Sequence, residues 1–120
     1  MLINISNHPK STWSAEQLEK AQQLYGEVVD YPFPLVDPSW SIEEVKGLAN
    51  ALYADITQKY PNKHTYLHIM GEHSLVYHLV SMFEQNGYTC VLSTTDRTVE
   101  VLPNGSKKVH FDFVRFRKYN

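Results

Sequence analysis

Apolar residues recur along this chain with two different periods, which alternate from one segment to the next. Short apolar runs of strand length occupy Leu2–Ser6, Val28–Tyr31, Tyr66–Met70 and Thr89–Ser93. The segments between these runs carry apolar residues three or four positions apart, which is the spacing of one face of a helix. Strands that alternate with helices are typical of a parallel sheet covered on both faces. The pattern therefore predicts an α/β fold.

Two of the predicted helices begin with the same set of capping residues. In the stretch WSAEQL, Ser14 can cap the first turn and Gln17 can return a hydrogen bond to the cap. The stretch WSIEEV repeats these offsets with Ser41 and Glu44. The first helix is expected to end at Gly26, because glycine readily adopts the left-handed conformation that closes a helix.

The C-terminal part of the chain combines a third helix with a hairpin. The helix is predicted from about Glu72 to Asn86, with Gly87 as its terminator. In the stretch TVEVLPNGSKKVHFDFVRF, an Asn104-Gly105 turn separates two alternating runs, which is a strong hairpin signal. We therefore predict one domain, residues 1–120, with a Rossmann-like three-layer α/β fold in which a mainly parallel sheet ends in an antiparallel hairpin.

The composition limits the classes of partner. The chain has 120 residues, a formal charge of -2 at pH 7 and a hydrophobic share of 42%. A chain of this length and hydrophobicity can bury the core of one domain. The near balance of acidic and basic residues argues against a protein that coats a long nucleic acid through bulk charge. An anionic ligand would have to bind at a local patch.

Cysteine usage and hydropathy bear on metal content and location. The only cysteine, Cys90, excludes an internal disulfide, and no Cys/His spacing suggests a zinc site. We therefore expect neither a metal nor a cofactor. The N-terminus lacks a signal-peptide pattern, and no apolar run approaches the roughly 20 residues that span a bilayer. We expect a cytoplasmic protein without membrane contact.

Polar segments follow three of the predicted parallel strands. They are SNHP after the first strand, GEHS after the third and STTDR after the fourth. Because ligands of open α/β sheets bind beyond the carboxyl ends of the strands, we expect these segments to converge at one rim. The candidate ligand-binding residues are Ser6, Asn7, Gly71, Glu72, His73, Ser74, Ser93, Thr94, Thr95, Asp96 and Arg97.

Each of the two later segments offers groups that bind anions. Gly71 permits close backbone approach at the start of a helix, where free N–H groups favour an anion and Ser74 can add a hydroxyl. The alternative is an ordinary helix cap, with Glu72 opposing the helix dipole. In STTDR, three hydroxyls and the planar guanidinium of Arg97 can hydrogen-bond phosphate or ribose. The alternative for STTDR is a polar turn.

Histidines supply the candidates for acid-base chemistry. His8 is the first candidate because its ordinary pKa lies near neutrality and it is predicted at the rim. His73 is the second. His68 lies within a predicted central strand, where a hydrogen-bonded structural histidine is the commoner outcome. Cys90 is expected to be a small core residue.

The last predicted strand carries two of the three arginines. Arg115 and Arg117 alternate with Phe116 and should share a face of the strand. They would line either a second basic surface or a dimer seam. The alternative is solvated charge that protects an edge strand.

The stretches SNHP, GEHS and STTDR, in their positions after the predicted strands, resemble the small stand-alone Rossmann-like proteins of CRISPR defence systems, which are similar to CARF domains. The match is architectural and covers most of the chain. The resemblance implies recognition of a cyclic oligoadenylate second messenger across the two-fold axis of a homodimer. It also implies, for the ring nuclease type, slow metal-independent cleavage of the ring. The appended effector domain of many CARF proteins is absent from this sequence.

Under that interpretation, a ribose 2'-hydroxyl attacks its neighbouring phosphate, with His8 as the base or acid and Arg97 among the groups that hold the phosphate. Two other classes of function stay open. One is a non-enzymatic interaction module whose aromatic hairpin pairs with another protein. The other is a small nucleotide hydrolase or transferase of unrelated lineage.

Overall fold

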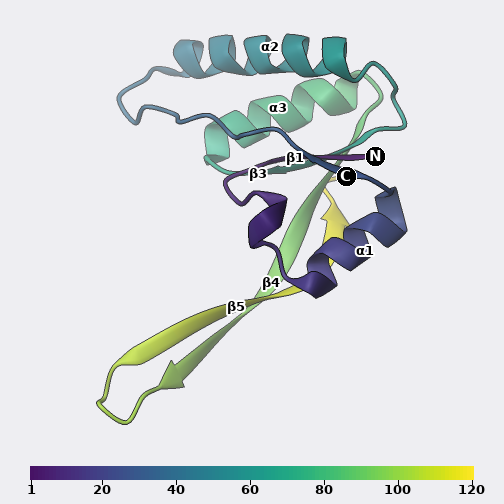
Figure 1. The fold of residues 1–120 in the computed structure, drawn as a ribbon. Helices are drawn as coiled ribbons and strands as arrows, with labels where there is room; N and C mark the ends of the chain where they lie inside the picture. Colours follow the sequence, from purple (N-terminus) through teal and green to yellow (C-terminus); the bar gives the residue numbers. More distant parts are fainter.

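The strands form one sheet with helices on both faces. The computed structural model describes residues 1–120 (Figure 1). The elements in chain order are β1 (Leu2–Ser6), the short 3-10 helix η1 (Lys10–Thr12), α1 (Ala15–Tyr25), β2 (Val28–Asp30), α2 (Ile42–Lys59), β3 (Tyr66–Met70), α3 (His73–Gln85), β4 (Thr89–Val101) and β5 (Lys107–Lys118). The predicted α/β fold, with a mainly parallel sheet and a C-terminal antiparallel hairpin, is confirmed.

The order of the strands reverses next to β1. Across the sheet the order is β2-β1-β3-β4-β5. β1 pairs in parallel with β2 on one side and with β3 on the other, β3 pairs in parallel with β4, and β4 pairs antiparallel with β5. In open α/β sheets, the carboxyl ends of the strands at such a reversal form the usual ligand crevice.

The two faces of β1 differ in character. Ile3 and Ile5 belong to the larger core cluster, which α2 and α3 cover, whereas Leu2 lies in a smaller cluster with a residue of α1. Figure 1 shows α2 and α3 together on one side of the sheet and α1 on the other. β1 is buried along its whole length. Asn4 and Ser6, which share the Leu2 face, are therefore polar groups in the interior.

The predicted helix starts are present, but one side chain is used differently. Ser14 Oγ accepts a hydrogen bond from the Gln17 backbone N–H at 3.1 Å. Ser41 and Glu44 form the predicted capping box. The Gln17 side chain does not return to its cap, because its amide donates instead to Ser93 Oγ in β4, 3.1 Å away. The capping position thus also supplies a link between α1 and the sheet.

The fourth strand continues well beyond its neighbours and forms an arm with β5. Only residues 89–91 of β4 pair with β3, whereas residues 91–101 all pair with β5. We call residues 95–113 the arm, and Figure 1 shows it extending away from the rest of the molecule. The radius of gyration is 16.0 Å, against roughly 14 Å for a compact chain of this length. The projecting arm explains the excess.

The stretch STTDR lies inside β4, so the prediction that it follows the strand is wrong. Its backbone pairs with β5 throughout, from Ser93 opposite Phe116 to Arg97 opposite Phe111. The prediction ended the strand where apolar residues end. An antiparallel pair can continue without burial, because each strand satisfies the backbone groups of the other. None of the helices is long and apolar enough to cross a membrane.

Candidate functional site

A pocket of about 490 Å³ lies at the carboxyl ends of the parallel strands, on the side of the sheet that α1 covers. Three strands contribute to its wall: β1 through Ser6, β3 through Met70, and β4 through Ser93 and Thr95. The segment between β1 and α1, the helix itself and the arm complete it with His8, Thr12, Trp13, Gln17 and Phe111. We call this cavity the strand-end pocket. Its place beside the reversal of strand order is the one expected for a ligand site.

A buried histidine forms the floor of this pocket. His68 is only 2% exposed, and each of its ring nitrogens has a partner. Nδ1 lies 2.9 Å from Asn4 Oδ1, and Nε2 lies 2.6 Å from Ser93 Oγ. Ser93 Oγ also accepts the hydrogen bond from the Gln17 amide. The prediction of a hydrogen-bonded structural histidine at this position is confirmed, and the same ring lines the pocket.

Asp30 fixes the direction of these hydrogen bonds. Its carboxylate can only accept, so the Asn4 atom 2.9 Å from Asp30 Oδ1 must be the amide nitrogen, Nδ2. The same nitrogen donates to the His8 carbonyl at 2.9 Å. The Asn4 carbonyl oxygen therefore faces His68 and accepts a hydrogen bond from the Nδ1–H group. It follows that Nε2 of the neutral ring is unprotonated and accepts the hydrogen of the Ser93 hydroxyl.

Burial keeps this imidazole neutral. Burial, and after it the charge of nearby His8, lower the pKa of His68 from its ordinary value near 6.5 to about 4. At neutral pH the ring therefore stands as a hydrogen-bond acceptor toward Ser93. His8 itself is exposed at the pocket.

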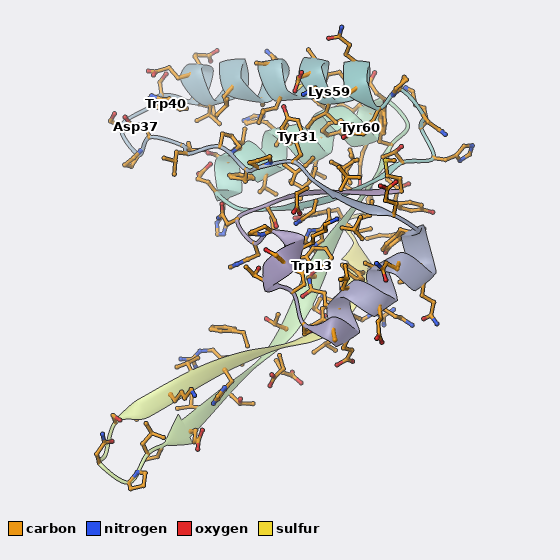
Figure 2. The ribbon with its side chains drawn as sticks, in the orientation of Figure 1. Trp13, Tyr31, Asp37, Trp40, Lys59 and Tyr60 are labelled. Atoms are coloured by element: carbon orange, nitrogen blue, oxygen red, sulfur yellow. The ribbon has the colours of Figure 1, made fainter.

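Aromatic rings border the pocket on two sides. Trp13 lies on the α1 side of the sheet (Figure 2), where its indole N–H donates to the His8 carbonyl at 3.0 Å. The Trp13 ring meets His68 edge-on, with the ring centroids 5.3 Å apart. Phe111 on the arm is 65% exposed. A planar ligand ring entering the pocket would meet both aromatic side chains.

The structure brings part of the predicted set together. Four predicted residues line the strand-end pocket, namely Ser6, His8, Ser93 and Thr95. They come from segments that are far apart in the sequence, as the prediction of one rim requires. Arg97 lies one step outward along the arm, on the same face of β4 as Thr95 and opposite Phe111. It stands beside the mouth of the pocket rather than in its wall.

The segment GEHS does not reach this pocket. A Cβ at Gly71 would lie 2.5 Å from the Phe33 ring, so this glycine makes room for an aromatic side chain. The Glu72 carboxylate accepts hydrogen bonds from the Ser74 and Leu75 backbone N–H groups, and these contacts, with the Ser74 hydroxyl first, lower its pKa. An anion already occupies the start of α3. The expectation that Gly71, Glu72, His73 and Ser74 join the same rim is therefore wrong.

The remaining predicted residues have other surroundings. His73 borders a separate cavity with residues of α3 and the C-terminus, and Asn7 borders a cavity beside Asp30. Thr94 donates to the Arg115 carbonyl at 3.1 Å, and Asp96 is exposed on the arm. Thr94 and Asp96 fall outside the strand-end pocket because adjacent residues of a strand point to opposite faces.

Sequence reasoning missed most of the residues that surround His68. Asn4, Trp13, Gln17 and Asp30 were not predicted at the site. One signal was available: Asn4 and Ser6 are two polar residues on the same face of an otherwise apolar strand. In a buried strand, such a pair needs hydrogen-bond partners from other elements.

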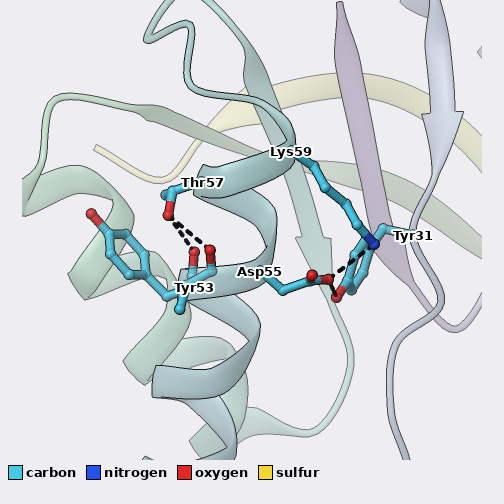
Figure 3. Close-up of polar contacts among 6 residues, drawn as sticks. Tyr31, Tyr53, Asp55, Thr57 and Lys59 are labelled. Carbon is cyan, nitrogen blue, oxygen red and sulfur yellow. Dashed lines mark hydrogen bonds and ion pairs between the residues drawn. The ribbon is translucent and has the colours of Figure 1, made fainter.

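A second polar cluster joins the segment after β2 to α2. The Tyr31 hydroxyl donates to the Asp55 carboxylate, and Lys59 Nζ lies 3.2 Å from the same carboxylate (Figure 3). Burial, together with the Asp55 carboxylate, raises the pKa of Tyr31 to about 12. Arg115 and Arg117 are both exposed, and their partners Thr94 and Leu92 place them on one face of β5. No group of three or more metal-ligand side chains is present.

Comparison with known proteins yields one match. No curated protein and no solved structure was found to match this chain. The sequence model of one family covers residues 1–117, which is nearly the whole chain. On that coverage, the chain belongs to the uncharacterized protein MJ1673 family.

Proposed function

We propose that the strand-end pocket binds a nucleotide, and that its ligand class is the cyclic oligoadenylate second messenger implied by the resemblance to CARF-like proteins. The observation that carries this proposal is the convergence of Ser6, His8, Ser93 and Thr95 beside two aromatic rings in one pocket. Hydroxyls suit ribose and phosphate, and aromatic rings suit bases. A volume of about 490 Å³ also lies in the range of small-ligand pockets.

We propose different roles for His8 and Arg97. The wall of the pocket holds neither lysine nor arginine. Arg97, beside the mouth, is the nearest arginine along the arm face that the pocket uses. We propose that it binds a phosphate of a ligand larger than one nucleotide, and that His8 takes part in metal-independent cleavage. Such a protein would act in the cytoplasm, in CRISPR-associated antiviral defence.

Binding and cleavage of a nucleotide panel test this proposal. Purified protein is titrated calorimetrically, in EDTA, with AMP, ATP and cyclic oligoadenylates of several ring sizes. We expect one ring size to bind most tightly, and Arg97→Ala to weaken that binding by roughly 10-fold or more, since it removes a charged hydrogen bond. Arg117→Ala is the matched control, because it removes the same charge from the opposite face of the sheet. Absence of binding across the panel would leave the interaction module as the better explanation.

We also propose that a second copy of the chain pairs with the free edge of β5. β5 is the last strand of the sheet and its outer edge has no neighbour. The arm exposes apolar side chains on one face, with Val99 opposite Val109 and Phe111 65% exposed. A long edge strand with one exposed apolar face is a template for pairing with another strand. A two-fold axis makes such a contact self-complementary.

The charges of the arm select one register for this pairing. Antiparallel β5 strands centred on His110 place Val109 opposite Phe111 and Lys108 opposite Asp112 of the second copy. Within one chain, Asp112 lies directly opposite Asp96, which is an unfavourable like-charge pair. Lys108 of the second copy would offset that repulsion. The two strand-end pockets would then open on the same side of the joined sheet.

Charge reversal tests the register. We expect a dimer by light scattering at micromolar concentration, a weaker dimer for Lys108→Asp, and recovery when Asp112→Lys is added. A monomer throughout this range would contradict the pairing, and so would a dimer that Lys108→Asp leaves unchanged.

A further inference from the structure

The hydroxyl of Ser93 has a fixed role on the floor of the pocket. Its hydrogen is directed to His68 Nε2, and one of its lone pairs accepts from the Gln17 amide. A hydroxyl oxygen has two lone pairs and one hydrogen. The group therefore has one remaining lone pair and no remaining hydrogen. Since Ser93 lines the strand-end pocket, it can only accept a hydrogen bond from a ligand there.

The series of hydrogen bonds from Ser93 through His68 to Asn4 is aligned for moving a proton inward. Ser93 Oγ donates to His68 Nε2 at 2.6 Å, and His68 Nδ1 donates to Asn4 Oδ1 at 2.9 Å. Ser6 Oγ donates to the same Asn4 oxygen at 2.8 Å, while Asp30 holds the Asn4 amide in place. A hydroxyl, an imidazole and an orienting side chain in this order resemble the arrangement in which a histidine activates a hydroxyl.

We propose that Ser93 and His68 form a proton relay that deprotonates a hydroxyl of the bound ligand. This inference rests on the proposed function, and it names the base that the function requires. His68 is the base, but it acts through Ser93 because the imidazole is 2% exposed and its Nε2 is occupied by the Ser93 hydroxyl, 2.6 Å away. Asn4 is a positioning residue that keeps Nε2 free of a proton. Ser93 is the catalytic residue, since it contacts the reacting hydroxyl.

The reaction step balances without another reactant. A ribose 2'-hydroxyl gives its proton to Ser93 Oγ while the Ser93 proton passes to His68 Nε2. The 2'-oxygen forms a bond to the adjacent phosphorus, and the bond from phosphorus to the 5'-oxygen breaks. The leaving 5'-oxygen takes a proton from protonated His8, which lines the same pocket. The products are a 2',3'-cyclic phosphate and a 5'-hydroxyl, and the two imidazoles return to their starting forms by exchange with water.

The first test needs no ligand. In Ser93→Cys, the introduced thiol stands against His68 Nε2, and its alkylation by iodoacetamide is followed against pH by mass spectrometry. We expect a lower midpoint in Ser93→Cys than in Ser93→Cys/His68→Gln, because only the imidazole can take the proton of the buried thiol. Cys90 gives little background, because it is fully buried and burial raises its pKa to about 12. Equal midpoints in the two variants, or a thiol that stays unreactive in both, would overturn the relay.

A measurement on the unaltered protein covers the case in which these variants fail to fold. Nitrogen-15 NMR of the histidine rings reports which nitrogen of His68 carries the proton at neutral pH. The relay requires a protonated Nδ1 and an unprotonated Nε2. The opposite tautomer would overturn it, because Ser93 would then receive a proton from the ring rather than give one up.

The second test separates the relay from the proposed function. If a cyclic oligoadenylate binds and is cleaved, Ser93→Ala should keep binding within a few-fold and slow cleavage by about 100-fold or more, the usual contribution of a general base. Asn4→Asp should shift the acid limb of the cleavage pH profile upward, because a carboxylate beside Nδ1 favours protonated His68. Unchanged cleavage in Ser93→Ala would overturn the relay and leave the binding proposal intact. No binding by the unaltered protein would overturn the proposed function, while the thiol titration would still decide the relay.

Discussion

The inner and outer parts of β4 belong to one strand but are held by different interactions. The inner part, residues 89–93, packs in the body of the protein: residues 89–91 pair with β3, and Cys90 and Val91 are buried. Residues 95–101 pair with β5 alone and are exposed. Burial holds the inner part, whereas hydrogen bonds and cross-strand pairs hold the arm. The strand-end pocket lies at the transition, with Ser93 on one side and Thr95 on the other.

This contrast suits the body and the arm to different roles in the proposed function. A buried network such as Asn4, His68 and Ser93 needs the rigid packing of the body to keep its hydrogen-bond directions. An arm without a core can instead adapt to a ligand or a second copy. A mutation in the body should therefore lower the free energy of unfolding much more than a similar mutation in the arm.

The largest effect is expected for loss of a phenylalanine from the body. Phe83 is fully buried between α2, α3 and the sheet, so Phe83→Ala should lower the free energy of unfolding by about 3–5 kcal/mol. Phe111→Ala removes the same ring from the arm, where it is 65% exposed, and should change that free energy by less than about 0.5 kcal/mol. Urea unfolding at low protein concentration measures both. Equal losses would show that the arm belongs to the same cooperative unit as the body.

The next largest effect is a pH dependence of the free energy of unfolding, which the buried His68 causes. Its pKa is about 4 in the folded protein, against about 6.5 in an unfolded chain. Between these values the unfolded chain binds a proton and the folded protein does not. The free energy of unfolding is therefore at its full value above pH 6.5. It falls by roughly 3 kcal/mol in total as the pH drops toward 4.

Urea unfolding between pH 4 and 7 checks this dependence. His68→Gln should flatten the slope in this window, whereas His110→Gln, which removes a histidine from the arm, should leave it in place. A slope that survives His68→Gln would mean that other groups cause it.

A smaller contrast is expected between two glycines with positive φ. Gly26 closes α1 with φ 86° and ψ -137°, a conformation that is costly for any residue with a side chain. Gly26→Ala should lower the free energy of unfolding by about 1–3 kcal/mol. Gly105, at φ 83° in the turn of the arm, has open space around it. Gly105→Ala should mainly increase hydrogen exchange in the arm, because the arm can open without unfolding the body. Faster exchange throughout the body in Gly105→Ala would contradict this separation.

Local signals were enough to predict the elements of the body. Ser14 and Ser41 cap their helices as predicted, and Gly26 ends the first one. β1 and β3 have the predicted bounds, and the Asn104-Gly105 turn joins β4 to β5. Capping, periodicity and turn chemistry are properties of short stretches, so they can be read without knowing the fold.

The site was predicted only in part because its partners come from different elements. The strand ends identified Ser6, His8, Ser93 and Thr95 correctly as neighbours. The start of α3 does not join the rim, and its alternative interpretation as an ordinary helix cap is confirmed, because the Glu72 carboxylate accepts hydrogen bonds from the first turn of its own helix. The role of Gln17 could not be read locally either. The sequence predicts that its side chain returns to the Ser14 cap, whereas the packing of α1 on the sheet places it against Ser93.

By itself, the sequence determined an α/β chain with polar groups at the carboxyl ends of its strands, because hydrophobic periodicity and capping act over a few residues. The tertiary structure alone decided that His68 joins Asn4 to Ser93, and that STTDR continues as an arm. Those outcomes depend on which strands become neighbours and on which donors find acceptors once water is excluded. Such choices are made between residues that are distant in sequence and meet only in the folded protein.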